Sequence, residues 1–253
     1  MYKPALLLLT LCSIAAAQWS QVPGKGTPRA KDGKPDLTAP TPHKADGKPD
    51  LSGIWGTESA KYLVNIAADF KPGELPIQPW ADAITKERMT GIHAAEESNA
   101  NCEPPGVPRI DNTPNPFKIV QEPDMIVILY EAFGQFRQVF LDGRKLPTDA
   151  NPTWLGYSVG RWDGNTFVAE STGFNGKTWL DQAGHPTTEA LHVTERYARR
   201  NFGHMDLQIT IDDPKAYTKP WTIIEPMVLL PDTDLIEYVC NENEKDLKHL
   251  GKK

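Results

Sequence analysis

Residues 191–212 alternate between apolar and polar side chains on both sides of a short connection at residues 201–203. Successive side chains of a strand point to opposite faces, so this pattern predicts a β-hairpin with one polar and one apolar face. With Arg200 opposite His204, the polar face carries His192, Thr194, Arg196, Asp206, Gln208, Thr210 and Asp212. The apolar face carries Leu191, Val193, Glu195, Tyr197, Met205, Leu207, Ile209 and Ile211. A chain with this hairpin must build a sheet that covers a core.

Short segments of strand character, joined by turns, continue over most of the chain after residue 116. They include FKIVQ, MIVILYE and QFRQVFL in a meander, GYSVGRW-DG-NTFVAES with a type I′ turn at Asp163-Gly164, and two strands within residues 221–240. Together with SGIW at residues 52–55 they make about ten strands and predict an all-β fold with one or two helices. We expect an antiparallel up-and-down barrel of the lipocalin or calycin type, with a β-sandwich as the alternative. Closure favours the barrel because it removes unpaired strand edges.

The N-terminal part of the chain, residues 1–50, differs from this β-rich part. Residues 1–17 combine a lysine, a short apolar run and a small-residue cleavage site, which predicts a secretory signal peptide and a periplasmic or extracellular protein. The apolar run is too short to span a bilayer. Residues 18–50 are rich in Pro and Gly and contain DGKPDL twice, which predicts an extended arm. Residues 51–253 are expected to form a single barrel domain, with a helix near residues 79–97.

Composition narrows the possible partners and cofactors. The formal net charge is −6 and no stretch concentrates Lys and Arg, so a nucleic-acid partner is not expected. No P-loop, no GxGxxG before a helix and no CxxC pair occurs, so no nucleotide, dinucleotide or iron–sulfur cofactor is expected. Outside the predicted signal peptide the chain has Cys102 and Cys240, which an exported protein most simply joins in a disulfide.

Glu195 is the one charged residue on the apolar face of the hairpin at residues 191–212. A carboxylate in a core must be paired, hydrogen-bonded or protonated, because desolvating a lone charge costs several kcal/mol. One interpretation is a general acid or base with a raised pKa. The other, which we favour, is an internal ion pair with Arg137, because Arg137 shares a predicted face with Val139 and Leu141.

A second polar cluster lies in the loop before this hairpin. Asp181 and His185 stand in a Gly-containing segment, where functional groups often gather at a barrel mouth, so both are candidate catalytic residues. His185, Glu189 and His192 have i, i+4, i+7 spacing, which could ligate zinc on a helix. The Pro-Thr-Thr segment at residues 186–188 leaves little room for that helix, so no metal site is expected.

Other polar and aromatic residues could complete a pocket. Tyr157 and Arg161 share a face of the hairpin at residues 156–171, with Tyr157 opposite Glu170 and Arg161 opposite Thr166, and could stabilise an oxyanion if that face lines the barrel. The candidate ligand-binding residues are Trp55, Trp80, Arg137, Trp154 and Tyr197. Large aromatic residues are, however, usually part of a core.

The segments DGKPDLSGIWG, CEPPGVPR, GRWDGNT, GHPTTEALHVTERY and DDPKAYTKPWT together resemble a large family of exported bacterial proteins. The resemblance covers nearly the whole chain after the predicted signal peptide and implies an exported protein, but carries over no catalytic residues. Gly53-x-Trp55 is also similar to the first strand of lipocalin-type barrels.

Three functions are compatible with these patterns. We expect first an exported barrel that binds a small, partly apolar molecule, because the strand pattern and tryptophans suit a pocket. The alternatives are an enzyme that uses Glu195 and His185 for proton transfer on a small organic substrate, such as a hydrolase, isomerase or lyase, and a cell-envelope interaction protein that uses residues 18–50 as a tether.

Overall fold

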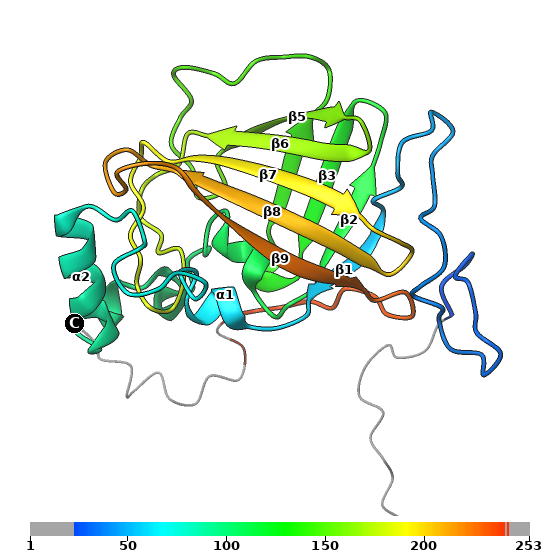
Figure 1. Ribbon diagram of the computed structural model, residues 1–253, viewed down its shortest axis with the longest axis horizontal. Helices are drawn as coiled ribbons and strands as arrows, with labels where there is room; N and C mark the ends of the chain where they lie inside the picture. The colour runs from blue at the N-terminus through cyan, green and yellow to red at the C-terminus, as the bar shows by residue number, and fades with distance from the viewer. Residues whose placement is uncertain (1–22, 241, 243–253) are drawn as a thin grey trace, which may run out of the picture.

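The chain folds into a closed barrel of nine strands, in which each strand pairs with its neighbours in sequence and the last pairs with the first (Figure 1). The computed structural model describes residues 23–240 and residue 242, so the predicted signal peptide at residues 1–17 lies outside the described residues. The strands are β1 (Gly53–Thr57), β2 (Phe117–Gln121), β3 (Met125–Tyr130), β4 (Phe136–Phe140), β5 (Tyr157–Asp163), β6 (Thr166–Thr172), β7 (His192–Arg199), β8 (His204–Asp212) and β9 (Trp221–Leu229). The predicted β-barrel is confirmed.

Two details of the predicted barrel are wrong. The pair β4–β5 is parallel, because the loop at residues 141–156 carries the chain back along the barrel before β5 starts, whereas every other pair is antiparallel. The strands follow one another in sequence order around the barrel, but their directions do not alternate at β4 and β5. Residues 221–240 supply one strand, β9, and the described residues after it contain no second strand.

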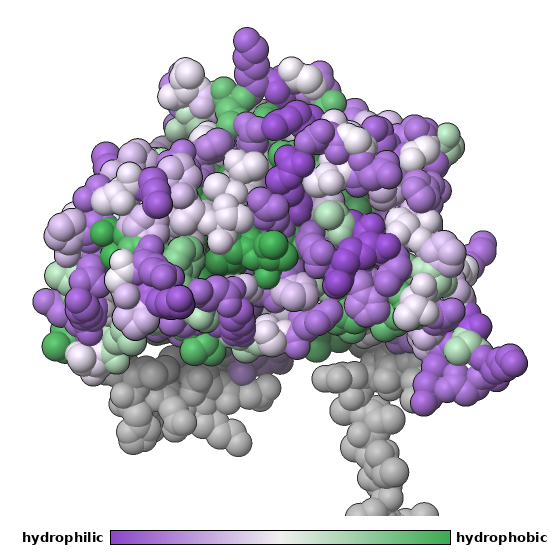
Figure 2. Space-filling model, viewed as in Figure 1, coloured by the Kyte–Doolittle hydropathy of each residue, from purple (hydrophilic) through white to green (hydrophobic). Residues whose placement is uncertain are grey.

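The hairpin β7–β8 has the predicted register, with Arg199 opposite Met205 and Ala198 opposite Asp206. Its inward side chains are buried and its outward ones are partly exposed, as the alternation predicts. The face of the molecule seen in Figure 2 is mainly hydrophilic, with separate hydrophobic areas.

The hairpin β5–β6 differs from its predicted register by two residues. Asp163 pairs with Thr166, so the turn is centred on Gly164 and Asn165, and Gly164 has a φ of +59°. The predicted pairs Tyr157–Glu170 and Arg161–Thr166 are therefore wrong. Tyr157 lies opposite Thr172, and Arg161 lies opposite Val168. A turn with positive φ at its first central residue suits glycine there, which explains the shift.

The helix predicted near residues 79–97 forms as α2 (Pro79–Met89), with proline at its first turn. It ends before Gly91, whose φ is +86°, and the 3₁₀ turns η1 (Ala94–Glu96) and η2 (Ser98–Asn101) follow. The remaining helical elements are α1 (Lys61–Val64), η3 (Arg109–Asn112) and η4 (Ala132–Gly134). Among the described residues, none of these helices has the length and apolar character to cross a membrane.

The buried segment at residues 105–113 closes one end of the barrel. It contains η3, which packs against α1 and reaches the interior, because Asp111 accepts a hydrogen bond from the inward-facing Tyr130 hydroxyl at 2.7 Å. The predicted disulfide between Cys102 and Cys240 is present and links the end of η2, just before this segment, to residue 240.

The described part of the predicted arm, residues 23–50, is folded onto the other end of the barrel. The two DGKPD copies form the same small turn, closed by Ala30 N–H to Lys34 O and by Lys44 N–H to Lys48 O, each at 2.9 Å. Arg29 forms a salt bridge with Asp232. The repeated hexapeptide is thus a repeated structural unit, and this part of the arm is not a free extension.

Candidate functional site

The inward face of the barrel holds an ion pair between Arg137 of β4 and Glu195 of β7. Arg137 Nη1 donates to Glu195 Oε1 at 3.0 Å, and Arg137 Nη2 donates to Glu195 Oε2. The Tyr197 hydroxyl donates to Glu195 Oε1 at 2.7 Å. Both charged side chains are buried, Glu195 completely. The predicted internal ion pair is confirmed, and both carboxyl oxygens of Glu195 accept hydrogen bonds from these donors.

Two inward-facing serines complete the coordination of Arg137. Its Nε donates to Ser158 Oγ at 2.9 Å, its Nη2 donates to Ser171 Oγ at 2.8 Å, and the two hydroxyls are 2.8 Å apart. The guanidinium is therefore hydrogen-bonded on several sides, which is what a buried cation requires.

Asp111 adds a third ionisable group to this network. Burial, followed by the nearby negative charge of Glu195, raises the pKa of Asp111 to about 8. Asp111 is therefore protonated at neutral pH, and the charges of Arg137 and Glu195 then balance. Ionising both neighbouring carboxyl groups beside a single guanidinium is unfavourable, because the two negative charges repel each other. No sequence pattern singled out Asp111, since only the fold brings η3 to β7.

A separate buried carboxyl, Glu225 of β9, has no hydrogen-bond partner at either oxygen. Burial raises its pKa to about 8, against the attraction of Lys61. The folded chain therefore holds a proton here that the unfolded chain releases above its ordinary pKa of 4.5. Stability is expected to fall as the pH rises from about 4.5 to about 8.

Replacing Glu225 with glutamine is expected to stabilise the protein by roughly 1–3 kcal/mol at pH 8, since the neutral amide has no charge to desolvate. The gain should shrink towards pH 4, where the carboxyl is protonated in both states. Urea unfolding at both pH values measures it. Glu122→Gln, in an exposed turn, is the matched control. An equal effect of the two substitutions at both pH values would contradict the role assigned to burial.

Asp181 and His185 form a second buried polar pair, in the loop between β6 and β7. His185 Nδ1 is 2.6 Å from Asp181 Oδ2, which also accepts from Ile66 N–H at 2.7 Å. Asp181 Oδ1 accepts from Gly184 N–H at 2.8 Å. A carboxylate held in this way fixes the orientation of the imidazole.

The structure does not bring the two predicted proton carriers together. Within the described residues no hydrogen bond or ion pair joins Asp181 or His185 to Arg137 or Glu195. Proton transfer shared by Glu195 and His185 has no geometric support.

The three residues considered as zinc ligands do not lie together either. His185 is bound to Asp181, Glu189 forms an exposed salt bridge with Lys215, and His192 begins β7 on its outward face. Residues 185–192 contain no helix, so the i, i+4, i+7 spacing does not create a common face. In the part of the chain that the structure describes, no group of three or more His, Cys, Asp or Glu side chains could hold a metal ion.

Tyr157 and Arg161 do not line the barrel, which corrects the prediction that made them oxyanion ligands inside it. Ser158 is the inward neighbour of Tyr157, and Arg161 points outward to a salt bridge with Glu170. The Tyr157 hydroxyl accepts a hydrogen bond from Arg144 Nη1 at 2.9 Å on the outer surface.

The aromatic residues predicted to bind a ligand do not lie together in one pocket. Trp55 is completely buried and donates from its indole to Leu51 O at 2.9 Å. Trp80 lies on α2 with 49% of its surface exposed. Tyr197 belongs to the interior network. Trp154 lies in a surface hollow together with Arg137 and Tyr157.

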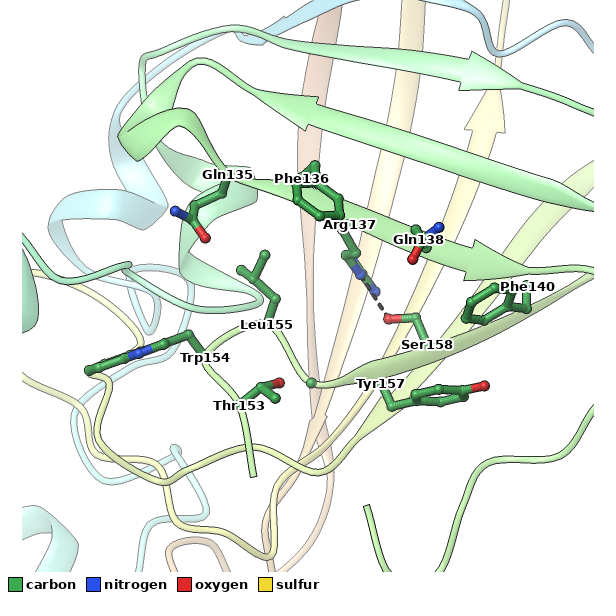
Figure 3. Close-up of a pocket in the computed structure, with 11 residues that line it drawn as sticks. Gln135, Phe136, Arg137, Gln138, Phe140, Thr153, Trp154, Leu155, Tyr157 and Ser158 are labelled. Atoms are coloured by element: carbon green, nitrogen blue, oxygen red, sulfur yellow. Dashed lines mark hydrogen bonds between the residues drawn. The ribbon is translucent and has the colours of Figure 1, made fainter. Parts of the chain in front are cut away.

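This hollow lies where β4 and β5 separate (Figure 3). The strands share only the pairs Val139–Ser158 and Phe140–Val159, whereas β3 pairs with β4 along its whole length. Residues 153–156 therefore diverge from the first half of β4 and leave a space of about 380 Å³. Its walls and floor are Gln135, Phe136, Arg137, Gln138, Phe140, Thr153, Trp154, Leu155, Gly156, Tyr157 and Ser158.

In comparisons with known proteins, no protein-family model and no curated protein matches the chain. The geometry of the site is thus the basis for the function proposed below.

Proposed function

We propose that the chain binds a small, partly apolar molecule in the hollow between β4 and β5. The observation that carries this proposal is the separation of two neighbouring barrel strands around a space lined by aromatic side chains. About 380 Å³ is within the range of small-molecule pockets. The interior of the barrel, by contrast, is occupied by core side chains and the Arg137–Glu195 network.

The apolar part of the hollow supports an apolar ligand portion. Phe136 has 64% of its surface exposed, and a ligand in the hollow would cover part of this apolar surface. Leu155 and Trp154 also line the hollow, and Figure 3 shows the Trp154 ring extending away from Leu155. Burying such surfaces provides most of the affinity in small-molecule sites.

Polar groups at the same place could orient the ligand. The amides of Gln135 and Gln138 and the hydroxyl of Thr153 line the hollow. Arg137 lies at its inner side and is held by Ser158, so the floor is rigid. A few fixed polar groups among apolar walls suit a molecule that is neither fully apolar nor strongly charged.

Binding of the fluorescent amine N-phenyl-1-naphthylamine tests the proposal. Phe136→Ala and Trp154→Ala are each expected to weaken binding by about tenfold or more, since each removes an aromatic wall. Ile224→Ala removes an exposed apolar side chain from β9, away from the hollow, and is the matched control. If the wild type does not bind the probe saturably, or if all three variants bind it equally, the hollow is not the binding site.

A further inference from the structure

A second hollow, of about 370 Å³, lies among α2, η2, η3 and the loop between β6 and β7. Two arginines line it, Arg88 from α2 and Arg109 from η3, together with Trp179 and Gln182 from the loop. It shares no lining residue with the hollow between β4 and β5. Segments far apart in the sequence thus bring two guanidinium groups to one small space.

Arg88 has a hydrogen-bonding capacity that the described residues do not use. Its guanidinium lies over the Trp179 ring, 4.3 Å from the centroid, and its Nη1 donates to Gly184 O at 2.9 Å. Its Nε is buried and has no acceptor. The salt bridges among the described residues do not include Arg88. Burial accordingly lowers the pKa of Arg88, with weaker opposing contributions from Glu96 and Tyr217.

Arg109 has the same unused donor. Its side chain is 2% exposed, and its Nη1 donates to Glu97 Oε1 at 2.6 Å. Its Nε is buried without an acceptor. Glu97 Oε1 also accepts from Asn99 N–H at 3.1 Å. Glu97 thus contacts Arg109 directly, and Glu96 attracts the charge of Arg88 from nearby.

A buried donor without an acceptor is unfavourable, and more so when it belongs to a charged group. Two guanidinium groups that line one space can offer their remaining N–H groups to the oxygens of a ligand bound there. Guanidinium groups match the oxygens of carboxylates and phosphates because their N–H groups diverge in a plane.

We propose that this hollow binds an oxyanion group of a small molecule between Arg88 and Arg109. Carboxylate, phosphate and sulfate share the chemistry that the two arginines recognise. Trp179 is almost completely buried, and its ring lies against the Arg88 guanidinium and helps to position it at the hollow. The site is independent of the function proposed for the hollow between β4 and β5.

Calorimetric titration of the full chain with inorganic phosphate, sulfate and benzoate, at constant ionic strength, tests this site. We expect saturable binding of at least one of these anions. Arg88→Gln should weaken it by about tenfold or more, because a neutral amide replaces a guanidinium. Arg88→Lys should have a smaller effect, since it retains the charge but not the planar group.

Arg161→Gln is the matched control, because Arg161 is an exposed arginine on the outer face of β5. It should bind the same anion as the wild type does. Binding of benzoate alone identifies a carboxylate ligand, and binding of phosphate or sulfate identifies a tetrahedral one. If none of the three anions binds saturably, or if Arg88→Gln binds as tightly as Arg161→Gln, the proposal is wrong.

Discussion

Replacing Arg137 with methionine is expected to destabilise the barrel by about 3–5 kcal/mol. The substitution leaves Glu195 completely buried without its cation, and it also removes the donors to Ser158 and Ser171. The attraction within the pair offsets the cost of desolvating both groups only while both are present. Urea unfolding followed by tryptophan fluorescence measures the loss.

Two further variants distinguish this explanation from a simple packing defect. Arg137→Met combined with Glu195→Leu removes both charges and should recover much of the lost stability. Arg161→Met breaks an exposed pair with Glu170 and should have little effect, since surface salt bridges contribute little. A double variant no more stable than Arg137→Met alone would show that the charge of Glu195 is not the cause.

The ion pair was predictable because both partners follow from strand alternation. Glu195 interrupts an otherwise apolar face, and Arg137 occurs on the apolar face of another strand. A buried charge requires an opposite charge, so the two could be matched without knowing the strand order. The structure confirms the pairing.

Asp111 could not be found in this way. It lies in a Pro-rich segment without periodicity, and it reaches the interior only because η3 closes the end of the barrel. Contacts that depend on how a loop folds back over a sheet leave no local pattern in the sequence. The same limit applies to Arg88 and Arg109, which line one hollow from two segments that are separate in the sequence.

The sequence left open which face of β5 points inward, for a related reason. On the inward face of β5, Ser158 and Gly160 are small and Trp162 is the one large apolar residue, so the sequence does not mark this face clearly as a core face. Ser158 faces inward to bond Arg137, and a side chain on Gly160 would meet the Phe167 ring within 3 Å. Where a core packs small residues against large ones, the small residues give no apolar pattern in the sequence. The parallel pairing of β4 with β5 was not predicted, because the length of the loop at residues 141–156 does not show in which direction β5 runs.

Loss of the Cys102–Cys240 disulfide is expected to reduce stability by about 4–5 kcal/mol, because the bond closes a long loop in the unfolded chain. The two cysteines are 138 residues apart, and the loop includes the barrel from η3 to β9. The Cys102→Ser/Cys240→Ser double variant and the wild type should differ by this amount in urea unfolding under oxidising conditions. With dithiothreitol the two should unfold at nearly the same urea concentration. A difference that persists in reductant would mean that the serines disturb packing, whereas equal stability without reductant would mean that the bond constrains little. A disulfide with the expected effect is consistent with an exported protein, because such bonds form and persist in oxidising compartments.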